Sequence, residues 1–135
     1  MSGTYTYTGN TYGLFYLSDI SEAMTGTFGC TLNFGTTPTV SNFALSVTGA
    51  NYAASISEAS GTLSTTGNNH INLDYTSGAW QLGPTGSPVS ATYGDAKGSV
   101  YGTNGEAVGG VWKMGEDVYY NYHATGVYQG TKVVE

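Results

Sequence analysis

The sequence predicts an all-β fold: a single small antiparallel β-barrel of about eight strands, up-and-down, with little or no helix. The 135 residues include 21 Gly and 12 Tyr among many Thr and Ser, a composition that favours strands and turns. No window keeps the apolar spacing of an amphipathic helix without meeting a glycine or a Thr/Ser run. Strand-like segments of about 6 to 10 residues alternate with turn signals. Closing such strands into a barrel removes exposed sheet edges, and the length fits one domain, residues 1–135.

The first half of the chain predicts strands that each have one apolar face. Residues 3–8 alternate Tyr with Thr, and residues 12–17 either continue that strand past Gly9 and Asn10 or form a second one. Residues 18–24 predict a short loop or a single helical turn. Further strands are expected at 25–34, where Phe28, Cys30, Leu32 and Phe34 define a core face, at 40–47, where Phe43, Leu45 and Val47 point one way, and at 52–56, 61–63 and 70–75.

The second half begins with residues 76–89, which predict a loop rich in Gly and Pro. Its length exceeds the two to five residues of an ordinary hairpin connection, and long loops on small barrels often carry function. Trp80 lies in this segment and is therefore a candidate contact residue. The remaining strands are expected at 90–93, 97–101, 107–114, 117–124 and 127–133.

Residues 98–112 read Gly-Ser-Val-Tyr-Gly-Thr-Asn-Gly-Glu-Ala-Val-Gly-Gly-Val-Trp, which predicts two short strands joined by a turn that carries one acid. Glycines in such a run mark positive φ or the close passage of another strand. The structural signature comprises Gly98, Gly102, Glu106, Gly109 and Gly110, with Gly105 as a further turn glycine.

This run resembles the signature hairpin of the transferrin-binding protein B-like β-barrel, a module of many Gram-negative surface lipoproteins and solute-binding proteins. Residues 25–34 look like the early strand pair of that family, and residues 124–130 look like its closing strand. At the turn the family often places proline and alanine, whereas this chain has Thr103, Asn104 and Gly105. The resemblance implies a cell-surface or secreted barrel of a Gram-negative bacterium that binds a protein or a small solute. It also implies that Glu106 caps backbone amides or fixes the hairpin rather than touching a ligand.

The charge balance argues against several partners. Nine acids face only Lys97, Lys113 and Lys132, there is no arginine, and the net charge is −6. Nucleic acid and anionic membrane surfaces are poor partners for such a chain, because both are bound through Lys and Arg. An acidic surface of Thr, Ser, Asn and Tyr is common in secreted and surface-displayed bacterial domains, and it also serves simple solubility.

Targeting signals are missing from the sequence as read. No stretch approaches the roughly 18 apolar residues of a membrane span, so no membrane insertion is expected from this segment. The start Met-Ser-Gly-Thr-Tyr has neither the basic region nor the apolar core of a signal peptide. The natural chain is expected to be a longer surface protein that contains this domain.

Catalytic motifs are also missing, and the chain is not expected to be an enzyme. The sequence contains no Gly-x-Ser-x-Gly elbow, His-Glu-x-x-His, phosphate loop or dinucleotide fingerprint. Cys30 is the only cysteine, so no disulfide forms within the chain, and it reads as a buried structural thiol. The adjacent acids Glu116 and Asp117 read as a solvated hairpin turn, with assistance to a metal site as the alternative.

Tyrosine supplies the candidate binding residues. Tyr119, Tyr120, Tyr122 and Tyr128 cluster near the C-terminus, and strand alternation points at least one ring of Tyr119 and Tyr120 outward. Exposed Tyr, Trp and Asn make adaptable binding surfaces, whereas rings that pack the core do not. The candidate ligand-binding residues are Trp80, Tyr119, Tyr120 and His123.

His70 and His123 are the only histidines, and both are expected to be surface or hydrogen-bonded structural residues on strands. Because some barrels of the resembling family carry haem or metal cargo, tyrosine and histidine are also candidate axial ligands. No cofactor or metal is otherwise expected.

Three functions remain open. The leading hypothesis is a non-catalytic binding module that presents loops to a protein or small-solute partner. The alternatives are a structural or assembly barrel of a larger surface protein without a ligand, and a carbohydrate-binding module in which Trp80 and exposed tyrosines stack on sugar rings.

Overall fold

The computed structural model describes residues 3–64, 70–76 and 78–133, and in these residues it contains ten strands and no helix. Thr and Tyr, which favour strands, recur through most of the chain. Their bounds are β1 Thr4–Leu17, β2 Ile20–Asn33, β3 Thr39–Thr48, β4 Tyr52–Ser64, β5 His70–Leu73, β6 Trp80–Pro84, β7 Val89–Ser90, β8 Tyr93–Tyr101, β9 Ala107–Glu116 and β10 Tyr122–Lys132.

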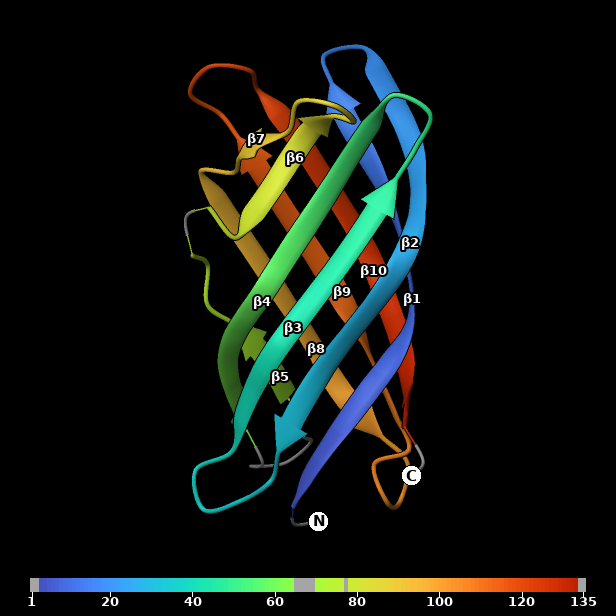
Figure 1. The fold of residues 1–135 in the computed structure, drawn as a ribbon, viewed down its shortest axis with the longest axis vertical. Helices are drawn as coiled ribbons and strands as arrows, with labels where there is room; N and C mark the ends of the chain where they lie inside the picture. Colours follow the sequence, from blue (N-terminus) through green and yellow to red (C-terminus); the bar gives the residue numbers. More distant parts are fainter. Residues whose placement is uncertain (1–2, 65–69, 77, 134–135) are drawn as a thin grey trace.

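Eight strands close into an antiparallel ring (Figure 1). The ring runs β1-β2-β3-β4-β5-β8-β9-β10 and returns to β1 through ten residue pairs between β1 and β10. The predicted all-β, up-and-down barrel is therefore confirmed. The chain departs from the simple order between β5 and β8, where β6 and β7 lie outside the ring as an added hairpin.

The added hairpin attaches because β4 pairs with two different strands along one edge. Tyr52 to Ile56 pair with β6, whereas Gly61 to Ser64 pair with β5. Between these halves Glu58 has a φ of 43°, and the register with β3 shifts. A residue in the left-handed region at a bulge bends its strand, which lets β4 leave β6 and join β5.

The barrel interior is filled by side chains that alternate with polar outward residues. On β2 and its continuation Phe28, Cys30, Leu32 and Phe34 are all buried, as the period-two pattern predicted. The same holds for Phe43, Leu45 and Val47 on β3. Burial raises the pKa of the Cys30 thiol to about 12, so the thiol is inert, as expected of a structural cysteine.

Trp112 is one of the two largest fully buried side chains, with Trp80, and the surroundings of Trp112 explain several sequence features. Its Nε1–H donates to Thr11 Oγ1 at 2.9 Å, and that hydroxyl donates to the carbonyl of Val127 at 2.8 Å. A Cβ on Gly126 would lie 2.6 Å from the indole ring. Glycine on a strand here makes room for an aromatic ring from its neighbour.

Several predicted element boundaries were wrong. Residues 3–8 and 12–17 form one strand, β1, which was one of the two alternatives. Only Ser18 and Asp19 turn, and β2 begins at Ile20, so residues 18–24 are neither loop nor helical turn. Residues 52–56 and 61–63 belong to one strand, β4, and the strand expected at 70–75 is the shorter β5. The expected loop 76–89 contains β6 and most of 90–101 forms β8, with β7 at Val89–Ser90. The strand expected at 117–124 is a loop at 117–121 followed by β10.

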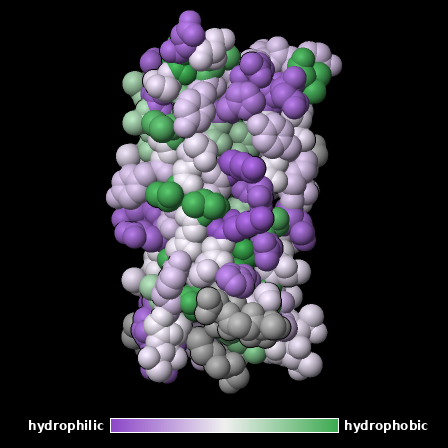
Figure 2. Space-filling model, turned by 180° about the vertical axis from the view of Figure 1, so that it is seen from behind, coloured by the Kyte–Doolittle hydropathy of each residue, from purple (hydrophilic) through white to green (hydrophobic). Residues whose placement is uncertain are grey.

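The outer surface is mostly polar or near neutral (Figure 2). On the face shown, apolar side chains occur as separate groups among polar ones rather than as a continuous band. The exposed large apolar residues of β1, β9 and β10 include Leu14, Val111 and Val127. Among the described residues, no helix is long and apolar enough to cross a membrane.

Candidate binding surface at one end of the barrel

The loop between β9 and β10, residues 117–121, is held in place by the last residue of β9. The carboxylate of Glu116 accepts hydrogen bonds from the backbone N–H of Tyr119, at 3.1 Å to each oxygen, and from that of Tyr120, at 2.8 Å. Glu116 is only 3% exposed, so its expected position in a solvated turn was wrong, whereas Asp117 is exposed as expected. A buried carboxylate that accepts several backbone N–H groups fixes the loop conformation.

This fixed loop exposes apolar and aromatic side chains. Val118 is 62% exposed, Tyr119 84% and Tyr120 50%. The expectation that at least one of the two tyrosine rings points outward is confirmed, although the residues lie on a loop and not on a strand. Exposed tyrosines on a rigid loop provide contact area at low conformational-entropy cost.

A row of rings connects the loop with the barrel interior. Tyr120 stacks on Tyr122 with ring centroids 5.1 Å apart, Tyr122 contacts Phe15 at 5.3 Å, and Phe15 stacks on Tyr52 at 4.2 Å. Burial raises the pKa of Tyr122, and the neighbouring acidic groups of Tyr120, Tyr52 and Glu116 act in the same direction. These contacts fix the ring of Tyr120 from one side and leave it half exposed.

Acidic residues share this end of the barrel. Asp19 lies in the β1–β2 turn, Glu22 near the start of β2, and Glu116 and Asp117 at the β9–β10 loop. Figure 1 shows these connections, with the β3–β4 turn, at the end opposite both chain termini. Glu22 accepts hydrogen bonds from the backbone N–H groups of Asn51 and Tyr52, which lower the pKa of its carboxyl. We call this the aromatic end, and define it by Tyr119, Tyr120, Glu116 and Asp117.

Both nitrogens of His123 are engaged. Its Nδ1 lies 2.9 Å from the hydroxyl of Tyr93, and its Nε2 lies 3.0 Å from Oδ1 of Asn121. A carbonyl oxygen accepts and a tyrosine hydroxyl can donate, which assigns the proton to Nε2. His123 thus helps to anchor the end of the loop. His70, also on a strand, is exposed, and its Nδ1 lies 3.5 Å from Ser99 Oγ.

Trp80 does not lie in an exposed loop, and that prediction was wrong. It is the first residue of β6, its side chain is fully buried, and its ring lies against Gly94 and Tyr75. The segment folds as a short hairpin that pairs with β4, so the indole faces inward. Its Nε1 is buried and makes no hydrogen bond with the described residues.

The signature hairpin forms at the other end of the barrel, between β8 and β9. Gly102 has a φ of 93°, and Glu106 Oε1 accepts the N–H of Asn104 at 2.6 Å, so the expected capping role is confirmed. Gly98 and Gly110 face each other across the two strands, and a Cβ on Gly110 would lie 1.9 Å from the carbonyl oxygen of Lys97. Gly109 has neither a positive φ nor a closely approaching strand, and a Cβ there would have its nearest neighbours at 3.5 Å. Gly105, in the same turn, has a φ of 65°.

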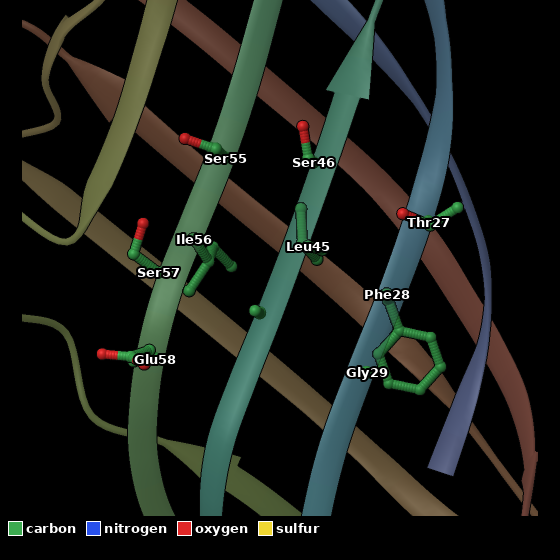
Figure 3. A pocket seen from close by; sticks show the side chains of 10 residues that line it. Thr27, Phe28, Gly29, Leu45, Ser46, Ser55, Ile56, Ser57 and Glu58 are labelled. Atoms are coloured by element: carbon green, nitrogen blue, oxygen red, sulfur yellow. The ribbon is translucent and has the colours of Figure 1, made fainter.

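A depression lies on the outer face of β2, β3 and β4 (Figure 3). Hydroxyl side chains of Thr27, Ser46 and Ser55 surround it, while Phe28 and Ile56 turn toward the interior. It has no exposed aromatic ring. Within the described ranges, no group of three His, Cys, Asp or Glu residues is arranged to hold a metal ion.

No protein-family model matches the sequence, and no curated protein matches it significantly. The fold and the aromatic end therefore carry the functional argument.

Proposed function

We propose that this chain is a non-catalytic binding module of a surface or secreted protein, in which a rigid barrel presents the aromatic end to a protein or small-solute partner. The observation that carries the proposal is the exposure of Val118, Tyr119 and Tyr120 on a loop that a buried carboxylate holds fixed. Folding gains little from these exposed side chains, because their apolar surface stays in water. A binding role accounts for them.

The resemblance of the signature hairpin to transferrin-binding protein B-like barrels supports the same function and a Gram-negative cell-surface location. The positive φ of Gly102 and Gly105 and the cap by Glu106 suit that hairpin. The burial of Trp80 removes one of the rings on which the carbohydrate alternative depended.

The test is a binding screen on the immobilised chain. Because both termini lie away from the aromatic end, a C-terminal tag leaves the loop free (Figure 1). Panels of extracellular proteins, small solutes and glycans are passed over the wild type and over Tyr119→Ala. The variant is expected to bind the retained partner with an affinity about 30-fold lower, as for a hot-spot residue that contributes about 2 kcal/mol.

The matched control is Tyr101→Ala. Tyr101 is 56% exposed and lies at the opposite end of the barrel, so its loss is expected to leave binding unchanged. Binding that survives Tyr119→Ala and Tyr120→Ala would reject the aromatic end as the contact. If no panel member is retained, the structural or assembly role is favoured instead.

A further inference from the structure

A pocket of about 530 Å³ lies beside the β9–β10 loop. Three tyrosines from two segments line it, Tyr75 after β5 and Tyr119 and Tyr120 on the loop. The hydroxyl residues Ser90 and Thr92 and the acid Glu116 also line it. The volume suits a small ligand or one side chain of a partner. Each polar group in this lining is a hydroxyl, a carboxylate or backbone, and none carries a positive charge.

The carboxylate of Glu116 has no counter-charge among the described residues. The one ion pair found in them joins Lys97 to Asp95 at 3.9 Å, and Lys132 donates to the carbonyl of Asn104 at the opposite end. Lys113 lies on β9 opposite Thr125 and Asp95, in an exposed position, whereas Glu116 is buried. A buried ion without a partner of opposite charge is costly, and backbone N–H groups offset only part of that cost.

The hydrogen bonds to Glu116, a residue of the pocket lining, leave acceptor capacity on its carboxylate. Oε1 accepts from Tyr119 and Tyr120, but Oε2 accepts only the N–H of Tyr119, which is shared between both oxygens at 3.1 Å. An ionised carboxylate has about four acceptor sites. Oε2 therefore keeps acceptor capacity that the described residues do not use.

We propose that this pocket binds an organic cation, an ammonium or guanidinium group, between tyrosine faces and the carboxylate of Glu116. Such a group meets the negative faces of aromatic rings and supplies the missing counter-charge. Asp117 next to the pocket, and Asp19 and Glu22 at the same end, attract the cation and repel anions. The inference rests on the proposed binding function and names the chemistry of its partner. The cation belongs either to a small amine or to a Lys or Arg side chain of a protein.

The experiment is a titration of the ¹⁵N-labelled chain followed by amide chemical shifts. The probes are tetramethylammonium, neopentyl alcohol as a neutral analogue of similar branched shape, a tetra-arginine peptide and a tetra-glutamate peptide. We expect saturable shifts at Thr92, Tyr119 and Tyr120 with the cations only, weakened by added salt. Saturation by tetramethylammonium identifies a small-amine site, and saturation by the arginine peptide alone identifies a side-chain site.

Two variants make the test specific. Glu116→Gln keeps hydrogen-bond acceptance but removes the charge, and it is expected to weaken cation binding by about tenfold or more. The matched control is Glu106→Gln, which changes the carboxylate that caps the β8–β9 turn at the opposite end and is expected to leave binding unchanged. If Glu116→Gln unfolds the loop, the test passes to Tyr119→Ala, which removes an exposed ring and no loop hydrogen bond. This variant must then lower the affinity for the cations by a similar factor.

Equal binding of neopentyl alcohol and tetramethylammonium, or no saturable shift with any cation, would overturn the inference. The proposed function fails separately, when Tyr119→Ala retains every partner found in the binding screen. A screen partner lost with Tyr119→Ala but without any cation effect leaves the binding module intact and rejects only the cation.

Discussion

At the scale of single residues, the glycines of the signature hairpin have different physical roles. Gly110 lies on the inner face, where the backbone of β8 passes so close that any side chain would overlap the Lys97 carbonyl. Gly109, its neighbour, faces outward with ordinary contact distances. Two adjacent glycines in one motif therefore make a matched pair for mutagenesis.

Gly110→Ala is expected to destabilise the fold by about 1–3 kcal/mol, because the backbone of a neighbouring strand must move to admit the methyl group. Gly109→Ala is expected to change the free energy of unfolding by less than about 0.5 kcal/mol. Urea denaturation of both variants checks the difference. Equal effects at the two positions would show that strand approach does not govern this hairpin.

Trp80 is the residue whose role changed most between sequence and structure. Trp80→Ala is expected to cost about 3–5 kcal/mol, and Leu73→Ala about 2–5 kcal/mol, since each leaves a cavity in the core. Thermal denaturation of both variants, with the exposed Tyr119→Ala as reference, measures the contrast. A Trp80→Ala protein as stable as Tyr119→Ala would contradict the buried position of the indole.

At the scale of elements, Glu22 joins β2 to the turn between β3 and β4. Its carboxylate accepts from the N–H groups of Asn51 and Tyr52 and from the side-chain amide of Asn51. The backbone bond from Asn51 is the main cause of the lowered pKa of this group. One acid thus fixes the geometry of two hairpins at the aromatic end.

The pH dependence of stability follows from that lowered pKa. The contribution of Glu22 is present above its unfolded pKa, near 4.5, and is lost as the pH falls through its lower folded pKa. Glu22→Gln is expected to lower the melting temperature at pH 7, with a difference that shrinks as the pH falls below about 4.5. Melting curves from pH 7 to pH 3 measure it. Equal melting temperatures of the two proteins at pH 7 would contradict this role of the Glu22 carboxylate.

Sequence patterns predicted the elements best where burial alternates strictly. Phe28 to Phe34 and Phe43 to Val47 were placed correctly, because a period of two depends only on which face is buried. β6 and β7 were missed, since they are short and lie in a segment rich in Gly and Pro. Only the pairing of β6 with β4, and of β7 with β6, makes them strands. The burial of Glu116 could not be read from the sequence either, because the hydrogen bonds that satisfy it come from the fold of its own loop.

At the scale of the whole molecule, one ring of strands with one filled interior is expected to unfold as a unit. Trp80 and Trp112 are both buried, so their fluorescence reports on that single core. We expect a circular dichroism spectrum of β-structure without helical bands, and denaturation curves by dichroism and fluorescence that coincide. Separate midpoints for the two signals would show that the β6–β7 hairpin unfolds on its own.

The ring is not equally strong around its circumference. β5 joins β8 through three residue pairs, His70, Ile71 and Asn72 with Ser99, Gly98 and Lys97, whereas β1 joins β2 through fourteen. Amide hydrogens at such a short junction exchange with solvent through local opening, without unfolding of the rest. Deuterium is therefore expected to enter β5 earlier than the β1–β2 pair. The barrel, although closed, is expected to open locally along the junction of β5 and β8.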